Sequence, residues 1–122
     1  MHTVAELHTF VKAAAEAGMT ADEVMTLVDY LSENPTAGDE IPGTGGCRKV
    51  RVAGRGKGKS GGYRTITFYT GRDLPVFLIT VFGKGEKSNL TQGERNQLRD
   101  FTKAIVNEYK KRVSPLAEKK GA

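Results

Sequence analysis

Two stretches near the start of the chain carry apolar residues at helical spacing. In residues 8–17 the apolar side chains recur at helical intervals, and Gly18 ends the pattern. Thr20 and Glu23 then form the sequence of a capping box, in which each side chain bonds to the other residue's backbone amide. The apolar stripe that follows stops before Pro35, because the residue preceding a proline avoids the helical region. The pattern predicts a hairpin of two helices.

Three segments in the middle of the chain have the composition of β-strands. Residues 49–52 alternate apolar and basic side chains, residues 63–70 are rich in β-branched and aromatic residues, and residues 76–82 form an apolar run. Residues 3–7 fit a short edge strand, whereas residues 35–46 are rich in turn residues and fit a loop. Because consecutive strands usually pair, the three central segments predict an antiparallel meander.

A third helix is expected near the end of the chain. Thr91 and Glu94 form a second capping-box sequence. An apolar stripe at helical spacing follows them: Leu98, Phe101, Ile105 and Tyr109. Residues 113–122 have little to bury and are expected to form a mobile basic tail. We therefore predict a single domain, residues 1–112, of the α+β class, with helices packed on a small antiparallel sheet.

Composition adds a division of charge to this picture. Residues 1–46 hold one cation and eight acidic residues, whereas residues 47–122 hold 18 cations and six acidic residues. This asymmetry predicts two differently charged surfaces, of which the basic one faces nucleic acid or another polyanion. The single Cys47 excludes an internal disulfide, and no Cys/His cluster has the spacing of a metal site. Since no apolar run approaches the roughly 20 residues of a membrane span and the N-terminus lacks a signal-peptide pattern, we expect a cytoplasmic protein that binds no membrane.

The strongest candidate for a functional site is the basic stretch from residue 48 to residue 64. Its 17 residues include glycines and seven cations but no acidic residue. The cations are Arg48, Lys49, Arg51, Arg55, Lys57, Lys59 and Arg64. Clustered cations repel one another, so a protein keeps them where an anion binds, and phosphate is the obvious candidate. The alternative is a solvated loop between two strands.

One motif in this stretch points to a function that its context excludes. Residues 53–60 satisfy a loose form of the phosphate-loop pattern of nucleoside triphosphatases. That loop needs a helix directly after its Lys-Ser pair, because the helix N-terminus faces the phosphates. Here Gly61 and Gly62 follow, and then a predicted strand. We therefore reject nucleotide hydrolysis.

The residue types that remain suit one reaction, the cleavage of RNA. The sequence has no Ser-His-Asp set, no recognisable carboxylate pair and no metal box, so an enzyme would depend on Arg, Lys and Glu86. RNA carries its own nucleophile, the 2′-hydroxyl, and a protein can cleave it by orienting the strand and stabilising the charged phosphorane. Arginine binds phosphate oxygens bidentately, and a lysine among other cations can have a lowered pKa and transfer a proton. The same residues would equally serve simple binding.

Three segments resemble the RelE/ParE superfamily of bacterial toxins, and in particular its RelE/HigB-like branch. They are residues 34–51, residues 56–64 (Gly-Lys-Gly-Lys-Ser-Gly-Gly-Tyr-Arg) and residues 82–91 (Phe-Gly-Lys-Gly-Glu-Lys-Ser-Asn-Leu-Thr). The resemblance implies a curved antiparallel sheet with two N-terminal helices packed against it. It also implies the toxin of a type II toxin–antitoxin system, which enters the ribosomal A site and cleaves mRNA there without a cofactor or metal. A cognate antitoxin would neutralise it by tight binding.

The resemblance also implies roles for individual residues. Lys49 and Arg51 correspond to the family's basic residues before the glycine loop, Arg64 to the arginine that contacts the scissile phosphate, and Lys84 and Lys87 to basic residues after the last strand. These five are the expected catalytic residues. The expected RNA-binding residues are Arg48, Arg55, Lys57 and Lys59.

Two departures from the RelE pattern bear on the chemistry. Gly85 stands where RelE has a second catalytic arginine, and no aromatic residue between Phe82 and Phe101 replaces the catalytic tyrosine of RelE. The identity of the general acid and base is therefore open. Two other interpretations also stay open: a non-catalytic inhibitor of DNA gyrase, as in the ParE branch, and an inactive relative that only binds RNA.

Overall fold

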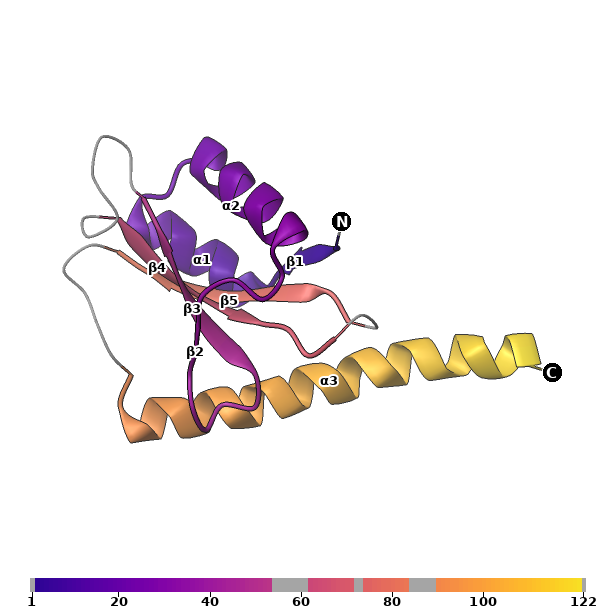
Figure 1. Ribbon diagram of the computed structural model, residues 1–122. Helices are drawn as coiled ribbons and strands as arrows, with labels where there is room; N and C mark the ends of the chain where they lie inside the picture. The colour runs from indigo at the N-terminus through magenta and orange to yellow at the C-terminus, as the bar shows by residue number, and fades with distance from the viewer. Residues whose placement is uncertain (1, 54–61, 72–73, 84–89, 122) are drawn as a thin grey trace. The chain divides into compact units, whose positions relative to one another are not determined.

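The computed structural model describes residues 2–53, 62–71, 74–83 and 90–121, with side chains up to Lys111 in the last range. These residues form an α+β fold, as predicted (Figure 1). The elements follow in the order β1 (Val4–Glu6), α1 (His8–Ala17), α2 (Ala21–Glu33), β2 (Asp39–Glu40), β3 (Cys47–Val52), β4 (Tyr63–Phe68), β5 (Val76–Phe82) and α3 (Gln92–Gly121). They divide into two compact units, residues 1–41 with 46–89 and residues 42–45 with 90–122.

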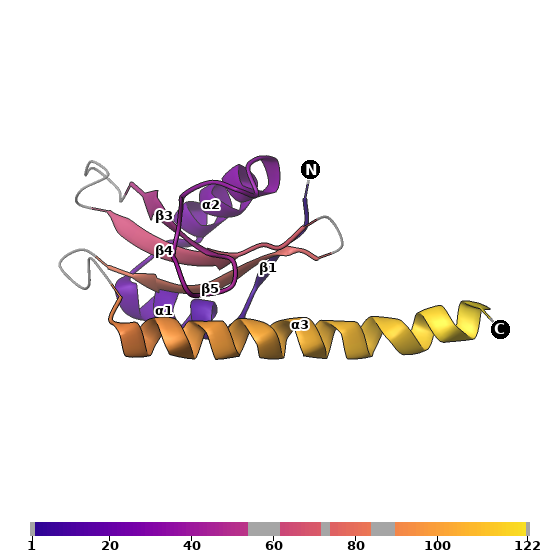
Figure 2. The same ribbon diagram turned by 60° about the horizontal axis from the view of Figure 1, so that its bottom comes forward.

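The strands form one sheet in the order β1-β5-β4-β3-β2. Strands β3, β4 and β5 pair antiparallel, which confirms the predicted meander, and Figure 2 shows β4 between β3 and β5. The edge strand predicted within residues 3–7 is β1, which pairs parallel with β5. The prediction of a loop over residues 35–46 was wrong in part, because Asp39 and Glu40 form β2 against β3. A two-residue polar strand has no apolar pattern, so only its partner reveals it.

The helical hairpin has the predicted boundaries and caps. Gly18 adopts a left-handed conformation (φ 79°) after α1, where a residue with a Cβ would be strained. The Thr20 amide donates to Glu23 Oε1 at 2.8 Å, and the Glu23 amide donates to Thr20 Oγ1 at 3.1 Å. Both bonds of the capping box are therefore made at the start of α2, and they fix the turn between the helices.

The two helices cover one face of the sheet, where the core lies (Figure 1). Buried side chains from both helices and from β3 and β5 form this core: Phe10, Ala14, Leu27, Leu31, Val50, Val76, Leu78 and Val81. One irregularity shapes β5: Ile66 pairs with Thr80 but Thr67 pairs with Leu78, which leaves Ile79 as an extra residue. The Thr9 hydroxyl of α1 donates to the Ile79 carbonyl oxygen at 2.5 Å and so holds this bulge.

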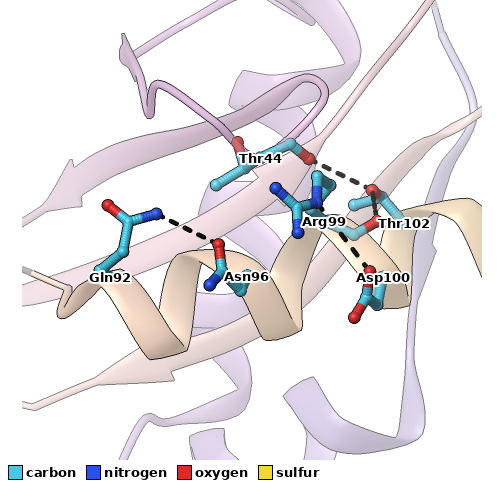
Figure 3. Close-up of polar contacts among 6 residues, drawn as sticks. All are labelled: Thr44, Gln92, Asn96, Arg99, Asp100 and Thr102. Atoms are coloured by element: carbon cyan, nitrogen blue, oxygen red, sulfur yellow. Dashed lines mark hydrogen bonds and ion pairs between the residues drawn. The ribbon is translucent and has the colours of Figure 1, made fainter.

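The second unit is built around α3. Its predicted capping box is present, since the Thr91 amide donates to Glu94 Oε1 at 2.8 Å and the Glu94 amide donates to Thr91 Oγ1 at 3.1 Å. Buried Thr102 has its hydroxyl 2.8 Å from the Arg99 carbonyl oxygen and 3.2 Å from the Thr44 carbonyl oxygen, which fastens residues 42–45 to the helix (Figure 3). The backbone of α3 continues to Gly121, beyond the predicted end near residue 112. The boundary at residue 112 and a mobile tail over 113–122 stay predictions.

Candidate nucleic-acid interface

The register of β3 and β4 brings three of the predicted site residues to one face of the sheet. Arg51 pairs with Arg64, and Lys49 pairs with Ile66. Directly paired residues point to the same face, and every second residue of a strand does so too. Lys49, Arg51 and Arg64 therefore share a face, which is opposite to the face that packs on α1 and α2. Neighbouring Val50 and Thr65 lie on the helix side instead, where Val50 joins the core.

Arg51 and Arg64 form a like-charged pair across the ladder. Arg51 is exposed and Arg64 is half-buried. Like charges directly opposite each other destabilise a sheet, so this pair has a cost that an anion between the guanidinium groups would remove. Arg64 Nε is buried and has no hydrogen-bond partner among the described residues. An unsatisfied buried donor costs about 1–3 kcal/mol, so Nε adds to the cost of keeping an arginine at this position.

Phe82 lies beside this pair, although the sequence did not single it out. It pairs with Arg64 on the strand at the other side, so Arg51, Arg64 and Phe82 form one row across three strands. The sequence indicated only a mostly buried strand over residues 76–82. Strict alternation would place Phe77 and Phe82 on opposite faces, but the extra residue at Ile79 brings them to the same one. An aromatic ring next to a guanidinium suits the stacking of an RNA base.

The same face is apolar at its other end. Cys47, Phe68 and Phe77 pair across β3, β4 and β5, and all three are buried. The rings of Phe68 and Phe77 stack with centroids 6.1 Å apart and an interplanar angle of 24°. The cations are thus concentrated at one end of the face. At that end β3 leads into residues 53–61 and β5 leads into residues 83–89, the two segments that hold most of the other predicted cations.

The remaining predicted residues do not join this group in the described part of the chain. Arg48 lies on the helix side of the sheet, and its Nη1 donates to the Gly38 carbonyl oxygen at 3.2 Å. Five predicted residues lie outside the described ranges: Arg55, Lys57, Lys59, Lys84 and Lys87. Their roles stay predictions, as does the consequence of Gly85.

Tyr63 anchors the start of β4, one residue before Arg64. Its hydroxyl lies 3.2 Å from Glu23 Oε1 and 3.4 Å from the Gly18 carbonyl oxygen, so it donates into the turn of the helical hairpin. Burial raises the pKa of Tyr63, and the charge of Glu23 and the hydrogen bond to it raise that pKa further. Because Tyr63 and Arg64 point to opposite faces, this anchor fixes the backbone from which the Arg64 side chain extends.

Within the described ranges, no three His, Cys, Asp or Glu side chains gather closely enough to hold a metal ion. None of the helices in those ranges is both long and apolar enough to cross a membrane.

Known proteins resemble this chain both in sequence and in structure. A family model described as the RelE toxin of the RelE/RelB toxin–antitoxin system matches residues 3–121. A solved structure of an E. coli RelE toxin, an arginine double mutant in the free state, is similar over 71% of this chain and 86% of that chain, with 22% sequence identity and a TM-score of 0.53. At that identity the structural likeness supports the fold, whereas the family model covers nearly the whole chain.

Proposed function

The chain belongs to the RelE family of toxin–antitoxin toxins, and from this premise we propose that it is an endoribonuclease that cleaves mRNA on the ribosome. The observation that carries the proposal is the row formed by Arg51, Arg64 and Phe82, with Lys49 next to it on the same face. This row combines phosphate-binding side chains with a ring on which a base can stack. Its position opposite the acidic helical hairpin leaves the cationic side of the sheet to face RNA.

In the proposed reaction the 2′-hydroxyl of the RNA attacks the adjacent phosphorus atom. Arg64 binds the non-bridging oxygens through the terminal nitrogens of its planar guanidinium as negative charge develops on the phosphorane. Arg51 lies opposite Arg64 and adds a second positive charge. Lys84 and Lys87, which follow β5, are proposed to complete the site. The nucleophile comes from the RNA itself, and we propose that the reaction involves neither a metal nor a cofactor.

The ribosome is proposed to supply the orientation of the substrate. A protein with few groups for proton transfer gains most when the RNA strand is already held in the geometry of attack. Such positioning alone can lower the activation free energy by about 7–11 kcal/mol. Ribosomal RNA is also a large polyanion that would attract the basic face. We therefore place the reaction in the ribosomal A site, in the cytoplasm. Membership of the family also implies an antitoxin, which we propose neutralises the toxin by tight binding.

The proposal is tested by comparing two substrates of the same sequence. Purified toxin is mixed with free mRNA or with that mRNA in an initiated 70S complex, and the new 5′ ends are mapped. We expect cleavage only in the ribosomal complex and only at the A-site codon. Efficient cleavage of free mRNA would contradict the dependence on the ribosome. Absence of any cleavage, together with inhibition of DNA gyrase, would favour the rival ParE-like function.

A further inference from the structure

The short strand β2 places one carboxylate on the cationic face of the sheet. Asp39 pairs with Lys49, and Glu40 pairs with Arg48. Because paired residues point to the same side, Asp39 lies on the face of Arg51 and Arg64, whereas Glu40 lies on the helix side. Asp39 is exposed. The sequence showed it only as one acidic residue in an expected loop, so its place became visible with the pairing of β2.

The backbone around Asp39 is fixed by close contact with β3. Gly38 has a φ of 92°, and a Cβ there would collide with the Lys49 carbonyl oxygen and lie 2.8 Å from Val50 Cγ2. The Arg48 guanidinium donates to the Gly38 carbonyl oxygen at 3.2 Å on one side of Asp39. On the other side, the Ile41 amide donates to the Cys47 carbonyl oxygen at 2.9 Å. The carboxylate therefore extends from a well-held strand.

The ladder also gives the position of Asp39 relative to the arginines. Directly paired residues have Cβ atoms about 4.5–5.5 Å apart, and diagonal neighbours are about 7–8 Å apart. Asp39 is thus next to Lys49 and diagonal to Arg51, with Arg64 one strand further away. The direct partners of Lys49, Arg51 and Arg64 on β4 and β5 are Ile66, Arg64 and Phe82. Among the described strand residues of this face, Asp39 is the one carboxylate.

We propose that Asp39 is the general base of the ribonuclease reaction, an inference that rests on the proposed function. The proton of the 2′-hydroxyl moves to the Asp39 carboxylate as O2′ forms a bond to phosphorus. The bond from phosphorus to O5′ breaks, and O5′ keeps the electron pair and takes a proton from a cationic group of the site. The products are a 2′,3′-cyclic phosphate and a 5′-hydroxyl. Arginine cannot act as the base, because its guanidinium does not release its proton in proteins, and a lysine ammonium has no acceptor for a proton, whereas a carboxylate accepts one directly.

A second explanation makes a different prediction. Asp39 could serve only to offset the charge of Lys49. Removing its charge would then strengthen the attraction of the face for RNA and leave cleavage equal or faster. If Asp39 is the base, the same change strengthens or preserves binding but slows cleavage. A variant that binds the ribosome at least as tightly as the parent chain but cleaves mRNA more slowly therefore supports our proposal over this explanation.

The experiment compares Asp39→Asn with Glu40→Gln, which removes a neighbouring carboxylate from the same strand but from the helix side. For each full-length variant, affinity for the programmed ribosome and the single-turnover rate of mRNA cleavage are measured. We expect Asp39→Asn to cleave about 100-fold or more slowly, the usual range for loss of a general base, with undiminished ribosome affinity. Glu40→Gln should stay within about twofold of the parent chain in both measurements. Asp39→Glu, which keeps a proton acceptor, should be faster than Asp39→Asn.

Three results would overturn the proposal. Cleavage by Asp39→Asn at the parental rate would show that Asp39 is not the base. A similar loss in Asp39→Asn and Glu40→Gln, with weaker ribosome binding in both, would show a structural role of β2. Absence of cleavage by the parent chain would overturn the proposed function itself, and this inference with it. Cleavage by the parent chain therefore distinguishes a failure of the proposed function from a failure of the proposal for Asp39.

Discussion

Arg51 and Arg64 lie directly opposite each other in the β3–β4 ladder, and no acidic residue is the direct partner of either one. A sheet that pairs two arginines directly gives up stability for a concentration of positive charge. The arrangement is understandable if a phosphate lies between or above them for part of the functional cycle. The pairing of Arg51 with Arg64 therefore bears on the free energy of unfolding as well as on the cleavage of mRNA.

Arg51→Glu should stabilise the fold and impair the function. The substitution replaces a repulsive cross-strand pair by an attractive one, so we expect the free energy of unfolding to rise by about 0.2–1 kcal/mol at low salt. The gain should shrink as salt screens the pair. Cleavage of ribosome-bound mRNA should fall, because the phosphate loses one cation and meets an anion. Chemical denaturation and the cleavage assay measure the two effects.

Arg51→Gln is the matched control for that substitution. It removes the repulsion without adding an attraction, so its stability should lie between those of the parent chain and Arg51→Glu. A lower stability of Arg51→Glu than of the parent chain would contradict the pairing seen in the ladder.

The sequence predicted the parts of this fold that depend on local interactions. The caps at Thr20 and Thr91 and the end of α1 at Gly18 involve groups only a few residues apart. Their patterns can therefore be recognised in the sequence itself. The family resemblance assigned catalytic roles to Lys49, Arg51 and Arg64, and the register shows that they share a face, although those roles stay predictions. Arg48 was grouped with them by charge alone, and strand alternation puts it on the other side.

The positions of two residues on the cationic face depend on strand pairing and could not be predicted from the sequence. Phe82 reaches the cationic face because Ile79 is an extra residue in β5, and a bulge leaves no clear trace in an apolar run. Asp39 reaches that face because Gly38 allows a close approach to β3. The sequence pattern of a glycine followed by two acidic residues is compatible with a loop and with a short edge strand, so it does not predict β2.

Tyr63→Phe should lower stability modestly and change its dependence on pH. Loss of the hydroxyl contacts to Glu23 and Gly18 should cost about 0.5–1.5 kcal/mol at neutral pH. Burial raises the pKa of Tyr63 above its usual value of 10.0, with Glu23 adding to the effect. A raised pKa means that the folded chain holds this proton more tightly than the unfolded chain does. The contribution is therefore complete below a pH of about 10 and is lost as the pH rises through the pKa of the folded state.

The measurement is the free energy of unfolding of both proteins as a function of pH. The parent chain should lose its advantage over Tyr63→Phe as the pH is raised above about 10. A constant difference between the two proteins across that range would show that Tyr63 does not titrate as argued. Activity near neutral pH provides a second readout, since a displaced β4 would also displace Arg64.

Neutralising the acidic hairpin should leave RNA cleavage unchanged. Asp22 and Asp29 are exposed on α2, which packs on the face of the sheet opposite to Arg51 and Arg64. We expect Asp22→Asn with Asp29→Asn to cleave ribosome-bound mRNA within about twofold of the parent rate, because these charges lie away from the RNA. Crosslinking to ribosomal RNA should map to the sheet. Crosslinks mainly within residues 8–34 would mean that the opposite face docks on the ribosome.

The central claim is that Arg64 stabilises the charge that develops on the scissile phosphate, and the cleavage rates of Arg64→Ala and Arg64→Lys test it most directly. Removing a donor that acts chiefly on the transition state costs about 2.7–4 kcal/mol, or roughly a hundred- to a thousand-fold in rate. We predict that loss for Arg64→Ala on ribosome-bound mRNA, with folding and antitoxin binding retained. Arg64→Lys keeps the charge without the planar fork and should also lose most of the rate. Cleavage by Arg64→Ala at the parental rate would contradict the account.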